Sequence, residues 1–255
     1  MPKGTALVTG ASSGIGADLA RICAAEGFDP ILVARDAGRL KELAATLSQA
    51  HGVKPAVVPA DLSDPAAPGA VFEAVGRAPV DLLINNAGFG LRGAYAETDW
   101  AVEAHMIQVN ITALAHLTKL FLPGMLRRGS GRILNVGSTA GFVPGPYMAV
   151  YYASKAFVQS FSESLSNEVK GSGVTVTLLC PGPTHTEFKA RAGMQNTLLF
   201  RGPAMASDDV AREGFRAMMA GKRMHIAGLR NRGMIRLTGL APRAMVADIV
   251  RRLNT

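Results

Sequence analysis

The sequence predicts an α/β fold built on a doubly wound parallel sheet of about seven strands, with helices on both faces. Short apolar runs suited to buried strands alternate along the chain with longer segments of helical period. A glycine-rich turn follows the first apolar run and opens a helix. The 255 residues, 48% of them hydrophobic, suffice to bury about three quarters of the unfolded surface in one core. We therefore expect residues 1–255 to form a single domain.

The first strand–turn–helix unit predicts an anion-binding site. The apolar run Thr5–Thr9 leads into Gly10-Ala-Ser-Ser-Gly14-Ile-Gly16. Glycines there let the backbone approach a pyrophosphate, whose charge is favoured by the free amides and dipole at a helix start. The spacing is Gly-xxx-Gly-x-Gly, in place of the more usual Gly-x-Gly-xx-Gly. The helix after the turn carries one apolar face, formed by Leu19, Ala20, Cys23 and Ala24.

The second strand, Phe28–Ala34, ends next to a basic residue that predicts the cofactor. Pro30 lies near the start of this strand, where a missing amide is tolerated. An acidic residue about twenty positions past the glycines binds the ribose of NAD, whereas an arginine suits the extra phosphate of NADP. Arg35 occupies that position and Arg39 follows one helical turn later. The pattern favours NADP over NAD; the alternative is that Arg35 only caps a surface strand.

Two further apolar runs predict the third and fourth strands. Val57–Leu62 forms the third, with Asp61 at its end, and Val80–Gly88 contains the fourth. Strands that alternate with helices in this way give right-handed parallel connections. Asn85 and Asn86 end a strand that is buried on both faces, so their amides need partners. We weigh bracing of the neighbouring strands equally with direct contact to a cofactor.

A long helix is predicted over Asp99–Pro123, rich in Ala, Val, Leu and Met. Its apolar surface is wide for one side of a monomer and predicts a subunit interface. Asn110 lies inside it among apolar residues, and a buried amide requires partners. It is either a hydrogen-bonded core residue or part of a functional site. The run Arg132–Val136 then predicts a buried strand with Ser138 at its carboxyl end, where open α/β sheets bind ligands.

A second long helix, starting at Tyr151, carries the strongest candidate for proton transfer. Tyr151 and Lys155 are four residues apart and share a face, whereas Tyr152 points about 100° away. A nearby ammonium favours the phenolate and so lowers the pKa of a tyrosine. We therefore choose Tyr151 over Tyr152. The apolar face of this helix is formed by Phe157, Phe161, Leu165 and Val169.

The last third of the chain predicts a lid and a basic tail. After the strand Val174–Cys180, the segment 187–206 has no clean period and reads as a substrate lid. A helix over Ser207–Met219 is expected to be N-capped by Ser207, and Arg223–Ala227 forms a last strand. The tail, about 229–255, ends in Pro242–Leu253 with Met245, Val246, Ile249, Val250 and Leu253 on one face.

The charge and cysteine content of the chain indicate which binding partners and which cellular compartment to expect. The net charge is +8, and residues 201–255 hold eleven Lys or Arg against four Asp or Glu. No Phe, Tyr or Trp follows Phe215, so the base-stacking surface that nucleic-acid binding needs is missing. Binding of the tail to a membrane surface is less favoured than closure of its apolar face over the lid or a neighbouring subunit. Cys23 and Cys180 show neither disulfide nor metal-ligand spacing, which predicts a reducing, cytoplasmic setting.

Five motifs in this order resemble the short-chain dehydrogenase/reductase family in its single-domain, Rossmann-fold form. They are Thr9-Gly-Ala-Ser-Ser-Gly-Ile-Gly16, Asn85-Asn-Ala-Gly88, Ser138, Tyr151-xxx-Lys155 and Pro181-Gly-xxx-Thr186. The tail, with Gly221-Lys-Arg and Ala241-Pro-Arg, resembles the bacterial, NADP-preferring branch of the family. The resemblance implies a tetrad. In it Tyr151 protonates the substrate oxygen, Ser138 holds the carbonyl, Lys155 binds ribose and lowers the Tyr151 pKa, and Asn110 anchors a water that relays protons.

The resemblance also implies a set of cofactor-binding residues. Asp61 would meet the adenine, Asn86 to Gly88 the adenosine ribose side, and Thr186 the nicotinamide carboxamide. Ser13 stands where many NADP-preferring members have a second basic residue, so the phosphate preference depends mainly on Arg35. The full set is Gly10, Ser12, Ser13, Gly14, Ile15, Gly16, Arg35, Arg39, Asp61, Leu62, Asn86, Ala87, Gly88, Tyr151, Lys155, Pro181, Gly182, Thr184 and Thr186.

These residues predict an NADP(H)-dependent oxidoreductase that acts on a carbonyl or secondary alcohol. Apolar and aromatic residues near the site favour a lipophilic substrate such as a ketoacyl, steroid-like or aromatic ketone; they are Phe142, Val143, Tyr147, Phe188 and Met194. The alternative is a non-catalytic NADP-binding sensor or regulatory protein, which the complete tetrad disfavours. We expect a homo-oligomer, a dimer or tetramer, formed through the helices near 99–123 and 151–170.

Overall fold

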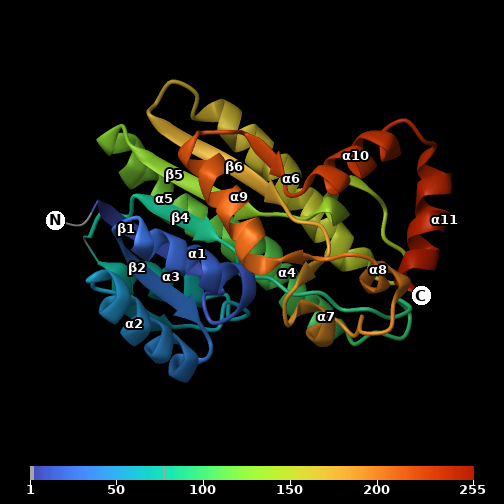
Figure 1. Cartoon of the computed structure of the whole chain (residues 1–255), viewed down its shortest axis with the longest axis horizontal. Coiled ribbons are helices and arrows are strands. Elements are labelled where there is room, and N and C mark those ends of the chain that lie inside the picture. Colours follow the sequence, from blue (N-terminus) through green and yellow to red (C-terminus); the bar gives the residue numbers. More distant parts are fainter. Residues whose placement is uncertain (1–2, 77) are drawn as a thin grey trace.

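The protein folds around one seven-stranded parallel sheet, seen in a computed structural model that describes residues 3–76 and 78–255 (Figure 1). The strand order is β3-β2-β1-β4-β5-β6-β9. The order reverses beside β1, so a crevice forms outside the carboxyl ends of β1 and β4. The strands are β1 Gly4–Thr9, β2 Phe28–Ala34, β3 Ala56–Pro59, β4 Leu82–Asn85, β5 Gly131–Val136, β6 Val174–Cys180 and β9 Met224–Ile226. The predicted fold class is confirmed.

Helices cover both faces of this sheet. Successive side chains of each strand point to opposite faces, so each face has its own apolar core. On β1, Ala6 and Val8 point into the core under α1, α2 and α9, whereas Leu7 points into the core under α3, α5 and α6. The main helices are α1 Gly14–Ala25, α2 Ala37–His51, α3 Ala67–Val75, α4 Trp100–Ile107, α5 Leu114–Arg128, α6 Ala149–Glu168 and α9 Ser207–Met219. All of these except α4 bury an apolar stripe against the sheet, whereas Met106 of α4 packs in the apolar cluster around Tyr151.

One pair of short strands and four further helices complete the last third of the chain. The strands β7 Thr184–His185 and β8 Met205–Ala206 pair with each other outside the main sheet. Between them lie α7 Phe188–Arg191 and α8 Leu198–Arg201. The chain ends in α10 Leu229–Thr238 and α11 Arg243–Asn254, which form the end of the molecule remote from the N-terminus (Figure 1).

The third strand and the helix at Ser207 differ from the prediction. β3 ends at Pro59, and Asp61 lies beyond it in a turn, where its Oδ1 accepts hydrogen bonds from the backbone N–H and the hydroxyl of Ser63. Proline has no N–H to continue the ladder, which accounts for the early end. Ser207 is the first helical residue of α9, after the extended N-cap Ala206, and its hydroxyl donates to Asp18 Oδ2 at 2.5 Å.

The long helix predicted over 99–123 continues to Arg128. Asp99 caps it by accepting a hydrogen bond from the N–H of Ala101 at 2.9 Å, and it passes through Pro123 before ending at the left-handed Gly129. A π-helical segment, Gln108–Ala113, separates α4 from α5. By length and composition alone this helix is compatible with a membrane span, a property that core helices share. Its buried residues Leu117, Phe121 and Met125 pack against the sheet.

A buried chain of polar side chains ties the middle strands to two helices. The Nδ2 atom of Asn85 donates to Thr118 Oγ1 at 3.0 Å and to Asn135 Oδ1 at 2.9 Å. Asn135 Nδ2 then donates to Ser162 Oγ at 2.9 Å, and Ser162 donates to the carbonyl of Val158. Of the two alternatives left open for Asn85, the bracing of strands is the one the structure shows.

We expect Asn135→Leu to lower the free energy of unfolding by about 2 kcal/mol, because it removes two buried hydrogen bonds and leaves Ser162 Oγ without its donor. Urea unfolding followed by circular dichroism measures this loss. Thr177→Val on β6 is the matched control, since the buried Thr177 hydroxyl has no partner among the described residues. An equal loss in both variants would show that the network adds nothing to stability.

Candidate active site

A single cavity of about 1210 Å3 runs along the carboxyl ends of the strands. It extends from the glycine turn and Arg35 at one end to Tyr151 and the C-terminal helices at the other. All of the sequence-predicted catalytic and cofactor residues line it except Asn110, Gly16 and Arg39. The crevice expected at the switch point of the sheet therefore exists, and it brings the residues from distant segments together.

The glycine turn is packed tightly against the end of β4. A Cβ at Gly16 would lie 2.2 Å from the carbonyl oxygen of Gly10 and 2.4 Å from Asn86 Nδ2, so only glycine fits there. Asn86 Nδ2 donates to the carbonyl of Thr9 at 3.0 Å, which fixes the turn to β4. Gly16 thus acts through packing and does not face the cavity, while Asn86 both braces the turn and lines the cavity. The start of α1 carries no acidic side chain, which leaves it suited to an anion.

Ser138 and Tyr151 face one another across the cavity. Ser138 follows β5, and its Oγ accepts a hydrogen bond from the N–H of Ala140 and donates to the carbonyl of Pro181. Burial raises the pKa of the Tyr151 phenol well above its usual range, and the Ser138 hydroxyl is the neighbour that partly opposes this rise. Tyr151 therefore holds its proton firmly at neutral pH.

Lys155 lies beside Tyr151 but is directed elsewhere. Its Nζ donates to the carbonyl of Val136 at 2.9 Å and lies 5.9 Å from the centroid of the Tyr151 ring. Burial lowers the Lys155 pKa to about 8. Burial is the main cause of the raised Tyr151 pKa, so the nearby Lys155 ammonium does not bring that pKa below its usual range in this structure. The ammonium also lines the cavity, where its remaining N–H groups are available to donate hydrogen bonds to ribose hydroxyls.

Asn110 belongs to the π-helical segment and is bonded entirely within the protein. Its Oδ1 accepts from the N–H of Phe89 at 3.1 Å, and its Nδ2 donates to the carbonyl of Phe89 and to Ser154 Oγ, both at 3.0 Å. Ser154 in turn donates to the carbonyl of Tyr151 at 2.7 Å. Asn110 thus supports the helix that carries Tyr151, as a hydrogen-bonded core residue does. π-helical segments often accompany functional sites.

Tyr152 is engaged in a separate contact. Its hydroxyl donates to Asn254 Oδ1 at 3.4 Å, while Asn254 Nδ2 donates to the carbonyl of Pro146 at 2.9 Å. Arg92 Nε reaches the Asn254 carbonyl at 2.5 Å. Sequence reasoning missed Asn254, since a residue near the chain end shows no local sign of such a contact. Tyr151 and Tyr152 both line the cavity, but the Tyr152 hydroxyl is engaged by Asn254, whereas the neighbour of the Tyr151 hydroxyl is Ser138.

The predicted lid covers Tyr151. The ring of Phe188 in α7 lies 5.2 Å from the ring of Tyr151, centroid to centroid, and Met194 is buried in the same apolar cluster. Two of the aromatic residues expected at the site lie elsewhere. Phe142 packs behind β6 with Leu114 and Val158, and Tyr147, in a left-handed turn at φ 65°, stacks under Arg251.

The two arginines expected to bind a phosphate differ in how closely carboxylates pair with them. Arg35 lies 4.0 Å from Asp61 across the cavity edge and is largely exposed. Arg39 instead pairs with Glu187 at 2.8 Å and with Asp36 at 3.5 Å. Glu187 also contacts Arg191 at 2.5 Å, and its pKa is held below the usual range, chiefly by Arg39. This pairing across 148 residues has no signal in the sequence.

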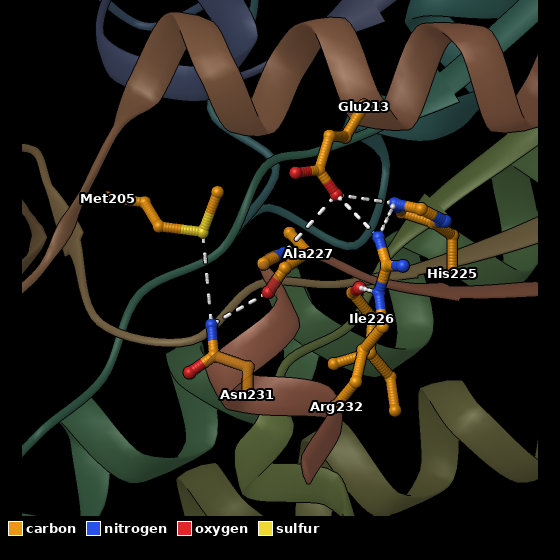
Figure 2. Close-up of polar contacts among 8 residues, drawn as sticks. Met205, Glu213, His225, Ile226, Ala227, Asn231 and Arg232 are labelled. Atoms are coloured by element: carbon orange, nitrogen blue, oxygen red, sulfur yellow. Dashed lines mark hydrogen bonds and ion pairs between the residues drawn. The ribbon is translucent and has the colours of Figure 1, made fainter. Parts of the chain in front are cut away.

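A polar cluster behind the cavity holds α10 and β9 in place (Figure 2). The Oε2 atom of Glu213 lies 2.6 Å from His225 Nε2, 3.1 Å from Arg232 Nη2 and 3.2 Å from the N–H of Gly228. Next to it, Asn231 Nδ2 donates to the carbonyl of Ala227 at 2.7 Å. A Cβ at Gly182 would lie 2.5 Å from this amide, so the cluster also supports the loop after β6.

Glu213 is expected to make stability depend on pH. Partial burial raises its pKa, but hydrogen bonds from His225 and Gly228 outweigh that effect and leave the pKa below the ordinary 4.5. Its contribution is therefore complete above about pH 4.5 and is lost as the pH falls through the folded-state pKa. We expect Glu213→Gln to cost about 1 kcal/mol at pH 7 and less at pH 4, measured by urea unfolding. A difference that grew toward acid pH would contradict this assignment.

The sheet order, the glycine turn and the cavity at the switch point define the class of nucleotide-binding α/β folds. The model of the family described as "short chain dehydrogenase" matches residues 4–197, and the chain belongs to that family. Sulfoacetaldehyde reductase 2 from Chromohalobacter salexigens is 42% identical over 189 residues, which cover 71% of this chain and 73% of that protein.

Two further comparisons extend this result. Dehydrogenase/reductase SDR family member 7B from Bos taurus is 38% identical over 195 residues, or 73% of this chain and 59% of that protein. The match thus spans less than two thirds of the length of this relative. A short-chain dehydrogenase from Sphingobium yanoikuyae in complex with NADPH has a TM-score of 0.85 at 35% identity, covering 97% of this chain and 96% of that one.

Proposed function

We propose that this protein is an NADP(H)-dependent oxidoreductase that acts on a lipophilic carbonyl or secondary alcohol, with Tyr151 as proton donor and acceptor. The observation that carries the proposal is one continuous cavity, lined at one end by Arg35 and the glycine turn and at the other by Ser138, Tyr151 and Lys155. When bound, the nicotinamide supplies or accepts the hydride.

The cavity fits a dinucleotide. The cradle at its base depends on the absence of side chains, since a Cβ at Gly88 would lie 3.0 Å from Asn110 Oδ1 and 3.4 Å from Lys155 Nζ. Free amides at the start of α1 would bind the pyrophosphate, Arg35 the additional phosphate of NADP, and Lys155 the ribose next to the nicotinamide. Arg39 is a weaker candidate for the phosphate, because Glu187 and Asp36 already neutralise it.

The protein's own groups then perform the proton transfer. Ser138 orients the carbonyl oxygen by donating a hydrogen bond, and Tyr151 gives that oxygen its proton as the carbonyl carbon is reduced. The raised pKa of Tyr151 keeps the phenol protonated until the substrate oxygen gains charge. Phe188 and Met194 exclude water from this end of the cavity. In the oxidative direction each step runs in reverse.

The lining of the cavity supports a lipophilic substrate. Beyond Tyr151 the walls are formed by apolar side chains of the segment before α6, the lid and the C-terminal helices, which are Val143, Met148, Phe188, Met194, Leu199, Phe200, Met234, Ile249 and Leu253. Such a surface favours a ketoacyl, steroid-like or aromatic ketone over a small polar aldehyde.

Oxidation of NADPH, followed at the nicotinamide absorbance with a panel of ketones and aldehydes, tests the proposal. We expect turnover with lipophilic ketones and a slower reaction with NADH. Tight binding of NADPH without turnover of any carbonyl would favour the alternative, a sensor or regulatory protein that retains the fold.

We further propose that the protein works in the cytoplasm as a homo-oligomer. Cys23 and Cys180 are both free and buried, which suits a reducing compartment. Large apolar side chains are exposed on the two helices expected to form the interface, with Trp100 63% and Phe157 39% accessible. Light scattering of the purified protein distinguishes a dimer or tetramer from a monomer.

A further inference from the structure

Two polar residues of helix α10 anchor it to the body of the protein, beside its one buried residue, Ile235. Arg232 Nη2 contacts Glu213, and Arg232 Nε donates to the carbonyl of Ile226 at 2.8 Å (Figure 2). Asn231 faces the same way through its bond to Ala227. These contacts fix the rotation of the helix, so its exposed residues are held outward.

The outward surface of α10 combines exposed leucines with the exposed Arg230 and Arg236. Leu229 and Leu237 are 80% and 70% exposed, and Leu240, just past the end of the helix, is 86% exposed. At 100° per residue, Leu229, Arg236 and Leu237 fall within a sector of about 100°. Exposed leucines gathered in this way mark an interaction surface, because water alone does not favour them.

The charge around these leucines is strongly positive. Residues 229–255 contain six arginines and one carboxylate, Asp248. A second copy of the same face would bring like charges together, which opposes self-association here. Helices that combine exposed leucines with arginines bind at the interface of membranes with anionic lipids, where phosphates meet the guanidinium groups and leucines enter the acyl region.

We propose that the face formed by Leu229, Arg236, Leu237, Leu240 and Arg243 docks on the surface of a membrane rich in anionic lipids. The sequence favoured closure of the tail over the lid, and α11 does pack there through Val246 and Val250. The α10 leucines remain outside that cluster, a distinction that only the contacts of Arg232 and Asn231 reveal.

The docking face lies next to the cavity, so docking would place the cavity at the membrane surface. Met234 and Leu237 of α10 and Ile249 of α11 line the same cavity as Tyr151, so its mouth opens beside the docking face. A lipophilic carbonyl dissolved in the bilayer would enter the cavity without crossing water. The entry of substrate from the bilayer rests on the proposed function, whereas the docking itself does not.

Co-sedimentation of the full chain with phosphatidylcholine vesicles, prepared with and without phosphatidylglycerol, tests the docking. We expect binding only to the anionic vesicles, weakened by added salt. Leu240→Gln should reduce the partition coefficient about tenfold or more. Arg236→Gln should reduce it about fivefold. The matched controls, Leu126→Gln and Arg127→Gln, change another exposed leucine–arginine pair and should leave binding unchanged.

Three outcomes would overturn the proposal. They are absence of binding to anionic vesicles at low salt, equal losses in the controls, and a change in the solution mass of Leu240→Gln by light scattering, which would identify the face as an interface between copies. NADPH oxidation with a water-soluble ketone is measured in parallel. Because Leu240 and Arg236 do not line the cavity, loss of vesicle binding with intact turnover separates the docking from the proposed function.

Discussion

Replacing Tyr151 by Phe is expected to lower kcat by a factor of about 10² to 10⁴, the range for loss of a general acid. The substitution keeps the ring, its packing against Phe188 and its burial, and removes only the proton that the substrate oxygen would receive. NADPH affinity should change little. Steady-state kinetics with a ketone substrate, together with an NADPH titration, measure both quantities.

Tyr152→Phe is the matched control for this experiment. It removes a hydroxyl of the same kind one residue along the helix, where the partner is Asn254 at 3.4 Å. We expect kcat to stay near the wild-type value. If Tyr151→Phe turned over at the wild-type rate, or if both variants lost activity equally, the proton donor would lie elsewhere.

Arg35→Asp should weaken NADPH binding by about 10- to 150-fold and leave NADH binding nearly unchanged. Loss of a charge-assisted hydrogen bond to phosphate costs about 1.5 to 3 kcal/mol, and repulsion from the new carboxylate adds to it. Asp61 already lies 4.0 Å from the guanidinium, so the variant would place two carboxylates at this edge. Dissociation constants from quenching of protein fluorescence report the change for each cofactor.

Arg21→Asp provides the comparison, because it makes the same charge change on α1 at a residue that does not line the cavity. Its effect on NADPH affinity should be small and removed by salt. Equal affinities of the unmodified protein for NADPH and NADH would refute the role of Arg35 directly. In that case the guanidinium would be only a cap at the end of β2.

The sheet and the residues that come together at its carboxyl edge were predictable, because short stretches of sequence mark each strand and turn. Apolar runs such as Phe28–Ala34 and Val174–Cys180 have the bounds that the structure shows, and glycines mark the turn before α1. Element ends were less predictable. Pro59 ends β3 early, whereas Pro123 does not end the long helix, since packing of Phe121 and Met125 on the sheet outweighs one missing hydrogen bond.

Contacts between distant segments left no trace in the sequence. The pair Arg39–Glu187, the bond from Tyr152 to Asn254 and the anchoring of α10 by Glu213 all join residues that no periodic pattern relates. Each involves a polar side chain of a type common on protein surfaces, so composition does not single it out. The consequences of these contacts, including the outward leucines of α10, therefore emerge only from the structure.

The burial of Asn254 has a practical consequence for handling the protein. This residue is fully enclosed, and through Arg92, Pro146 and Tyr152 it fastens the last helical turn to the segment that carries the phenol. Purification tags belong at the opposite terminus, which lies at the far side of the molecule (Figure 1). Even trimming two residues from the carboxyl end would remove Asn254 and loosen the wall of the cleft.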